Sequence, residues 1–459
     1  MKGNRLINFA LAAVALLWGI SHAFKPAAVQ AASSEAPHWG EGGVPQFQID
    51  PDWPKIPSKW KVGFGSAVVG DNKGNVWILS RPRRLPKEDQ ASAAPPVMEF
   101  DQAGNFIQGW GGQSGPGYQW PSNEHGFFVD DNGFVWIEGN ADGKSNNPAD
   151  LPNDNQILKF TNDGKFVMAI GQSGQTGSNS THILKGATDI FVNTKNNEVY
   201  VSDGYGNSRI IVFNANTGEF IRMWGAYGHT PLDMDRRPAR AALKQDPWTA
   251  VSEVLQQFGS PMHDVKVSND QLLYAADRGN KRVQVFTPDG KFLTEQFVGP
   301  DLADLQVRGL AFSPDPGQRF LYVGGTPDAW ILNRRTLEIL GTVKTVPKGG
   351  PVGQTGTSNI GHLLGVDTNG NLYTAGELST VFGKTQGAFK YKLTGYSPTI
   401  PCCQAPRNIS AARQALERLR RLRQQTSGGS DLGSPLGALV KADAEKWWPI
   451  IKDSGIKAE

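Results

Sequence analysis

Short runs of alternating apolar and polar residues, separated by turns, recur along the chain. In residues 125–170, a first run is followed by a turn rich in Asp, Asn and Gly, and three further runs end with residues 165–170. Residues 193–224 repeat this order. Because the runs are rich in β-branched and aromatic residues and lie between turn signals, the pattern predicts β-strands rather than helices.

The same unit occurs six times when the chain is aligned with itself. The copies lie at about residues 63–110, 125–170, 188–224, 259–298, 307–343 and 361–396. Four-stranded repeats of about 40 residues are typical of β-propellers. The sequence therefore predicts an all-β fold, a six-bladed β-propeller whose closed ring protects its strand edges; we number the blades one to six in chain order.

Two inserts interrupt the repeat. Residues 140–153 are polar and rich in Asn, Asp and Pro, which predicts a loop. Residues 227–258 include a predicted helix at about 247–258, with Trp248 and Leu255 on its apolar face. Inserts between blades lie on one face of the ring, so we expect this helical insert to cap the channel.

The N-terminus is typical of an export signal. Lys2 and Arg5 precede an apolar run at residues 9–20, and small residues follow, with cleavage expected after Ala23 or Ala31. An uncleaved membrane anchor is the alternative, although the run is shorter than the roughly 20 residues of a spanning helix. We expect a periplasmic or secreted protein with no membrane span in the mature chain.

The character of the chain changes after Pro401. Residues 409–423 predict a basic helix with a solvated charged face, for which an anionic partner is the alternative, and a Ser/Gly linker follows. Residues 436–459 resemble the C-terminal helix of periplasmic solute-binding proteins of tripartite tricarboxylate transporters. This short resemblance brings no ligand site with it, but it agrees with a periplasmic address.

These observations divide the chain into five parts. They are a signal peptide with the start of the mature N-terminus (1–31), an N-terminal extension (32–59), the six-bladed propeller (60–400), the basic helix with its linker (401–435) and a C-terminal helix (436–459).

Composition narrows the classes of function. The chain has 459 residues, 39% of them hydrophobic, which is enough for a large core, and its 54 Gly suit many tight turns. A net charge of +3 is too small to predict a nucleic-acid partner. The two cysteines, Cys402 and Cys403, are adjacent, so disulfides do not hold the fold together.

Three histidines occupy the same repeat position in alternate blades. They are His125, His263 and His362, in blades two, four and six. Alternate blades of a six-fold ring point at its axis from three directions, and three His with an open position suit a catalytic zinc, although copper or iron fit the same ligands. The alternative is that each histidine is a hydrogen-bonded residue of the channel. Ser66, Thr188 and Arg308 fill this position in the other blades.

Two segments resemble a known family. Residues 199–211 with 218–225, and residues 275–286, are similar to the corresponding stretches of peptidyl-α-hydroxyglycine α-amidating lyases. These are six-bladed propellers of the NHL type with a zinc ion on the ring axis. The resemblance covers about residues 60–396, and the motif around Tyr205 is its most specific part.

The resemblance implies roles for particular residues. The zinc ligands fall on His125, His263 and His362. The catalytic tyrosine falls on Tyr205, the catalytic arginine on Arg81, and a second active-site arginine on Arg278. The alternative for Tyr205 is a channel-lining aromatic residue, and for Arg81 a solvated loop residue.

The resemblance also implies a structural calcium. Its backbone ligands would be the carbonyl groups of Val68 and Phe127, but Leu363 stands where the family has an Asp. A hard cation prefers charged oxygen ligands, so calcium at this position is doubtful.

The implied reaction is cleavage of the N–C bond of a peptidyl-α-hydroxyglycine, a small-molecule or peptide C-terminal substrate, to an amide and glyoxylate. Two alternatives remain from the residues alone. One is a different zinc propeller enzyme, of hydrolase or lactonase type, that would bind metal in a differently lined channel. The other is a non-catalytic NHL binding module that would bind no stoichiometric metal.

Overall fold

The computed structural model describes residues 43–141, 154–175, 177–232, 257–300, 302, 307–325, 328–344, 362–376 and 387–397. The predicted signal peptide, the basic helix with its linker, and the C-terminal helix lie outside these residues. So does most of the predicted helix at 247–258, and its last residue, Phe258, is not helical. No helix within the described ranges is long and apolar enough to cross a membrane.

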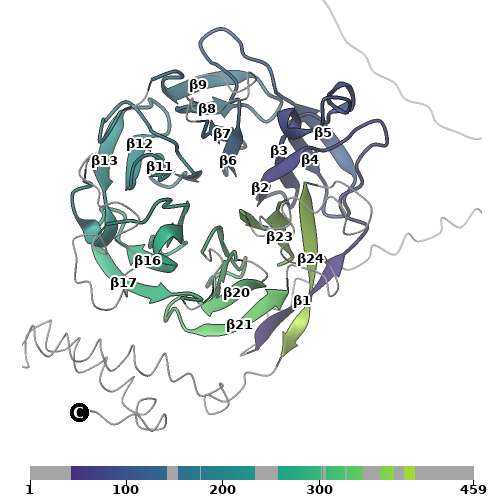
Figure 1. Cartoon of the computed structure of the whole chain (residues 1–459). Helices are drawn as coiled ribbons and strands as arrows, with labels where there is room; N and C mark the ends of the chain where they lie inside the picture. Colours follow the sequence, from purple (N-terminus) through teal and green to yellow (C-terminus); the bar gives the residue numbers. More distant parts are fainter. Residues whose placement is uncertain are drawn as a thin grey trace, which may run out of the picture. The chain divides into compact units, whose positions relative to one another are not determined.

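Six four-stranded antiparallel sheets confirm the predicted propeller (Figure 1). Blade one consists of β2 (Phe64–Gly70), β3 (Val76–Arg81), β4 (Val97–Phe100) and β5 (Phe106–Trp110). Blade two consists of β6 (Glu124–Val129), β7 (Val135–Gly139), β8 (Gln156–Phe160) and β9 (Phe166–Gly171). Blade three consists of β10 (Asp189–Asn193), β11 (Glu198–Asp203), β12 (Arg209–Asn214) and β13 (Phe220–Trp224). Blade four consists of β14 (Asp264–Val267), β15 (Leu273–Asp277), β16 (Arg282–Phe286) and β17 (Phe292–Phe297). Blade five consists of β18 (Leu310–Phe312), β19 (Phe320–Val323), β20 (Asp328–Asn333) and β21 (Ile339–Lys344). Blade six consists of β22 (Leu364–Val366), β23 (Leu372–Ala375), β24 (Ala388–Ser397) and β1 (Val44–Asp50). Short 3-10 turns are η1 (Pro82–Arg84), η2 (Gln90–Ser92), η3 (Ala226–Gly228) and η6 (Arg278–Asn280).

The ring closes through its inner strands. Each first strand contacts the first strand of the next blade, in the order β2, β6, β10, β14, β18, β22 and back to β2. The apolar core is correspondingly divided into clusters between neighbouring blades; one of them joins Ile157 and Ile170 of blade two to Val199 and Ile211 of blade three. Burial therefore fixes the angle between blades, and with it the direction in which each inner strand faces the axis.

Strand β1 completes blade six by pairing with β24, in the register Val44 to Ser397 through Asp50 to Lys390. The sequence analysis placed residues 44–50 in an extension outside the propeller, which is wrong. The partners are about 350 residues apart in the chain. A local alternation pattern cannot reveal such a pairing, because it shows that a strand exists but not where it docks.

We expect Phe47→Ala to lower the free energy of unfolding by about 2 kcal/mol, since a partly buried aromatic side chain is lost. The Phe47 ring packs edge-on against Tyr322 of blade five, with 5.7 Å between centroids. Denaturant unfolding measures the change. Gln48→Ala, at an exposed position of the same strand, should stay within about 0.5 kcal/mol of the wild type. Equal stability of Phe47→Ala and the wild type would contradict a closing role for β1.

The antiparallel order of each blade separates two faces of the ring. First and second strands are joined by tight turns, in which the carboxylate of Asp71 or Asp130 accepts backbone amides and a Trp Nε1–H. At the opposite face lie the start of the first strand, the end of the second and the segments between blades. The three histidines lie on this loop face, together with Tyr205, Arg81 and Arg278.

Candidate metal centre

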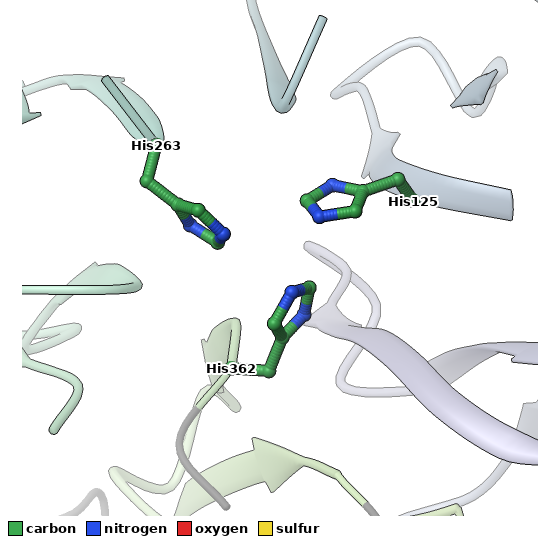
Figure 2. A group of neighbouring side chains, drawn as sticks. All are labelled: His125, His263 and His362. Atoms are coloured by element: carbon green, nitrogen blue, oxygen red, sulfur yellow. The ribbon is translucent and has the colours of Figure 1, made fainter. Parts of the chain in front are cut away.

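The three histidines converge on the ring axis (Figure 2). His125 lies in β6, His263 directly before β14, and His362 two residues before β22. All three are buried, and one potential ligand atom from each lies within 4.8 Å of the others. The imidazole centroids are 4.6 Å apart for His125 and His362, and 5.3 Å apart for His125 and His263. The repeat thus brings together residues that are distant in the chain, since His125 and His362 are more than 200 positions apart.

Backbone carbonyl groups set the orientation of the rings. The Nδ1 atoms of His125, His263 and His362 lie 2.7, 2.8 and 2.8 Å from the carbonyl oxygens of Thr188, Arg308 and Ser66. These three residues occupy the histidine position in the intervening blades. Since a carbonyl oxygen only accepts hydrogen bonds, each Nδ1 carries the proton and each neutral ring keeps its lone pair on Nε2.

Burial lowers the pKa of all three histidines well below the usual value, and nearby positive charge lowers it further. For His125 and His362 that charge includes Arg81, and for His263 it includes Arg278. The neutral imidazole is the form that binds a metal ion. The donor set and its protonation state therefore fit zinc, while copper and iron accept the same ligands.

Tyr205 lies beside the histidines. It follows β11 by two residues, and its hydroxyl oxygen is 3.2 Å from His125 Nε2 and 3.5 Å from His263 Nε2. The side chain is 36% exposed, so one side of the ring faces solvent while the hydroxyl reaches the buried imidazoles. A phenol hydroxyl group thus lies against two of the three convergent histidines.

The two predicted arginines come from blades one and four. Arg81 ends β3; its Nε donates to the Glu124 carbonyl oxygen at 2.5 Å and its Nη2 to Ser66 Oγ at 2.9 Å. Burial lowers the pKa of Arg81 to about 10, so the group remains cationic at neutral pH. Arg278 follows β15, and its Nε is buried without a hydrogen-bond partner in the described part of the chain.

Two matching ion pairs hold the loops that carry Tyr205 and Arg278. Asp203 accepts hydrogen bonds from Arg209 Nε and Asn207 Nδ2 at 2.9 and 2.7 Å. Asp277 accepts the equivalent bonds from Arg282 Nε and Asn280 Nδ2 at 2.7 and 2.8 Å. The sequence analysis did not predict that these ion pairs hold the two loops, although an Asp, an Asn and an Arg recur in both motifs that carry the family resemblance.

Sequence reasoning also missed two buried acids next to His125. Glu124 and Glu138 are 1% and 0% exposed, and each has one carboxylate oxygen with no hydrogen-bond partner among the described residues. Burial raises the pKa of Glu124 to about 7 and that of Glu138 well above its usual value. The adjacency of Glu124 to His125 was a visible signal, but Glu138 reaches the histidine only through strand pairing.

The position at which the family has its calcium-binding Asp is apolar in this chain. Leu363 packs in an apolar cluster with Ala67 and Phe127, so the side chain that replaces the family's Asp is buried against hydrocarbon. On the other side of the channel, Lys266 Nζ lies between two carboxylates, in contact with Asp189 and 2.5 Å from Asp264 Oδ1. With Leu363 in place of the carboxylate, the described residues fit a structural calcium poorly. Between Asp189 and Asp264, the Lys266 ammonium group provides the positive charge.

We expect Lys266→Met to lower the free energy of unfolding by about 3 kcal/mol, because it leaves two buried carboxylates without their cation. Thermal or denaturant unfolding measures the loss. Lys165→Met, which removes an exposed ion pair with Asp163, should leave the free energy of unfolding close to that of the wild type, because an ion pair in water contributes little. Stabilisation of the wild type by added calcium would contradict our interpretation of this side of the channel.

The chain is similar in sequence to amidating lyases and to NHL repeat proteins. No protein-family model matches the chain. It is 25% identical over 352 residues to peptidyl-alpha-hydroxyglycine alpha-amidating lyase 1 of Drosophila melanogaster, covering 71% of this chain and 57% of that protein. It is 26% identical over 254 residues to NHL repeat-containing protein 3 of Mus musculus, covering 53% and 58%. It is 28% identical over 236 residues to peptidylglycine alpha-amidating monooxygenase of Rattus norvegicus, covering 49% and 20%.

The match thus spans less than two thirds of each of these relatives. Among solved structures, a streptogramin B lyase superposes with a TM-score of 0.43 at 14% identity, covering 76% of this chain and 98% of that one. This structural similarity is too low to bear on function. The sequence relatives are amidating lyases and NHL repeat proteins at modest identity, as the two quoted motifs predicted.

Proposed function

We propose that the chain is a metal-dependent carbon–nitrogen lyase that cleaves an α-hydroxyglycine, as the amidating lyases do. One observation carries the proposal: the Tyr205 hydroxyl lies 3.2 and 3.5 Å from the Nε2 atoms of two of three convergent histidines. Arg81 and Arg278 reach the same face of the ring from opposite blades. A relative that is similar over 71% of this chain has a name that states this activity.

The reaction needs one proton to move and one bond to break. In R–CO–NH–CH(OH)–COO⁻, the hydroxyl group loses its proton, its oxygen forms a carbonyl with the same carbon, and the C–N bond breaks. The bonding electrons go to nitrogen, which takes up a proton, so the products are an amide and glyoxylate. A zinc ion held by the three Nε2 atoms would supply Lewis acidity, which lowers the pKa of a hydroxyl group at its open position.

Tyr205 would move the proton. In the described structure the Tyr205 hydroxyl donates to a histidine Nε2 lone pair. A substrate hydroxyl bound beside the Nε2 atoms would be within hydrogen-bond reach of Tyr205 Oη. In its phenolate form Tyr205 would accept the hydroxyl proton and then donate it to the departing nitrogen, a contribution of typically 10²- to 10⁴-fold in rate. The exposed side of the ring leaves room for the substrate to approach from solvent.

Arg81 and Arg278 would bind the carboxylate of the glyoxylate unit. A planar guanidinium matches a carboxylate with two parallel hydrogen bonds. The bonds from Arg81 to the Glu124 carbonyl and Ser66 Oγ fix the plane of its guanidinium, and it forms no other hydrogen bond to the described residues. The buried Nε of Arg278 has no partner there either, so both groups have donors for an anion.

Metal-loaded protein incubated with an N-acyl-α-hydroxyglycine, such as α-hydroxyhippurate, tests the proposal. We expect glyoxylate and the amide in equal amounts, with release abolished by a chelator and restored by zinc. Bound metal without glyoxylate release would favour a different metal-dependent propeller enzyme. Absence of bound metal after zinc addition would favour a binding module.

We further propose a periplasmic or secreted location and a small molecule or peptide C-terminus as the ligand, with no nucleic-acid partner. The export signal predicted at residues 1–31 supports the location. Fractionation of cells that express the full chain, with N-terminal sequencing of the mature protein, tests it. Recovery of the uncleaved chain in the cytoplasm would contradict it.

A further inference from the structure

Among the described residues, His125 alone of the three histidines has a carboxylate within ion-pair distance. Glu138 Oε1, on β7, is 3.5 Å from His125 Nδ1, and both side chains are buried. The same oxygen accepts the Gly126 backbone amide at 2.7 Å. No comparable contact is formed by His263 or His362 in this part of the chain. The histidine centre is therefore asymmetric, with an acid against one ligand only.

The backbone makes room for this contact. A Cβ atom on Gly126 would lie 2.6 Å from Glu138 Oε1, which is too close for any side chain, so glycine directly after His125 lets the carboxylate lie against the imidazole. The second oxygen, Oε2, is buried without a hydrogen-bond partner in the described residues. A buried acid with an unsatisfied oxygen is costly, and such groups in native proteins usually have a role that offsets the cost.

Charge around the axis identifies that role. Three neutral imidazoles give no charge to balance a dication, and Arg81 and Arg278 add positive charge nearby. The Thr188 carbonyl fixes the His125 ring, and a carboxylate beside the same Nδ1–H makes the other ring nitrogen a better donor. In its ionised form Glu138 would also reduce the cost of burying the cation, because opposite charges attract strongly in a low-dielectric interior.

We propose that Glu138 is a positioning residue of the metal centre, one that acts through His125 to strengthen it as a ligand and that balances the charge of the bound cation. The inference rests on the metal site of the proposed function and extends it to a residue outside the ligand set. It makes His125 the strongest of the three ligands. The competing explanation is that Glu138 balances the charge of Arg81, which lies in the same region.

Zinc affinity of Glu138→Gln, measured by competition with a chromophoric chelator, tests the proposal. We expect a loss of about 10- to 100-fold, the usual effect of removing such a partner. Glu124→Gln is the matched control. Glu124 is equally buried, lies in the same blade and also has an unpartnered oxygen, but its other oxygen accepts Trp120 Nε1–H, and its carboxylate has no ion-pair contact with an imidazole among the described residues. We expect that variant to stay within about threefold of the wild type.

Unfolding of the metal-free proteins provides the second readout. Glu138→Gln should be at least as stable as the wild type without metal, because it removes a buried acid, so a loss of affinity is not a loss of fold. If Glu138→Gln does not fold, Glu138→Met takes its place, with the same expected loss of affinity. Zinc affinity within twofold of the wild type would overturn the inference and leave the metal site standing. A wild type that binds no zinc would overturn the metal site itself, and the inference with it.

Discussion

His263→Ala should bind less than a tenth of the zinc bound by the wild type and lose at least about 10³-fold in kcat/KM for α-hydroxyhippurate, because two imidazoles cannot hold a catalytic zinc. His263 is fully buried and its ring is fixed by the Arg308 carbonyl at 2.8 Å. Alanine removes both the ligand and this bond. Elemental analysis after dialysis and initial rates of glyoxylate release measure the two effects on the same preparation.

His182→Ala is the matched control for this prediction. His182 is an exposed residue in the segment before β10, and it does not belong to the group of three convergent histidines. Its replacement should leave zinc content and rate within about twofold of the wild type, as for most exposed positions. Full zinc content in folded His263→Ala would contradict the assignment of the centre.

Tyr205→Phe should lower kcat by about 10²- to 10⁴-fold while zinc content stays unchanged. The substitution keeps the ring and removes the hydroxyl that lies against His125 and His263. We expect KM to change only a few-fold, because the carboxylate of the substrate would be held by the two arginines. Steady-state kinetics of the metal-loaded variant separates kcat from KM.

Tyr118→Phe controls for the loss of a phenol hydroxyl. Tyr118 stacks on Phe166 with 4.5 Å between centroids and lies on the outer side of blade two. We expect its removal to leave kcat unchanged. If Tyr205→Phe kept the wild-type kcat, proton transfer would have to involve another group, and the mechanism proposed for this site would be wrong.

The repeat explains how much of this centre could be predicted from the sequence. Alternation and turn signals predicted six blades, and the structure confirms them. The shared position of three histidines in alternate blades then predicted a convergent set, since position within a repeat translates directly into position around a ring. Tyr205, Arg81 and Arg278 were named only by resemblance, because the end of a second strand and the loop after it have no periodic pattern that shows where the side chains point.

Contacts between distant strands could not be predicted. The docking of β1 on β24 joins the two ends of the described propeller, and Glu138 meets His125 only because β7 pairs with β6. The carbonyl groups of Ser66, Thr188 and Arg308 orient the histidines through backbone atoms, so their side chains carried no signal. Repeats predict where residues lie in a blade, but not which atoms meet across it.

The most direct test of the central claim is an anomalous difference map from crystals of zinc-loaded protein, measured on both sides of the zinc absorption edge. The account predicts one strong peak on the ring axis, about 2.0–2.1 Å from the Nε2 atoms of His125, His263 and His362. A zinc peak held by other residues, such as Cys402 and Cys403, or no peak on the axis of fully loaded protein, would contradict it.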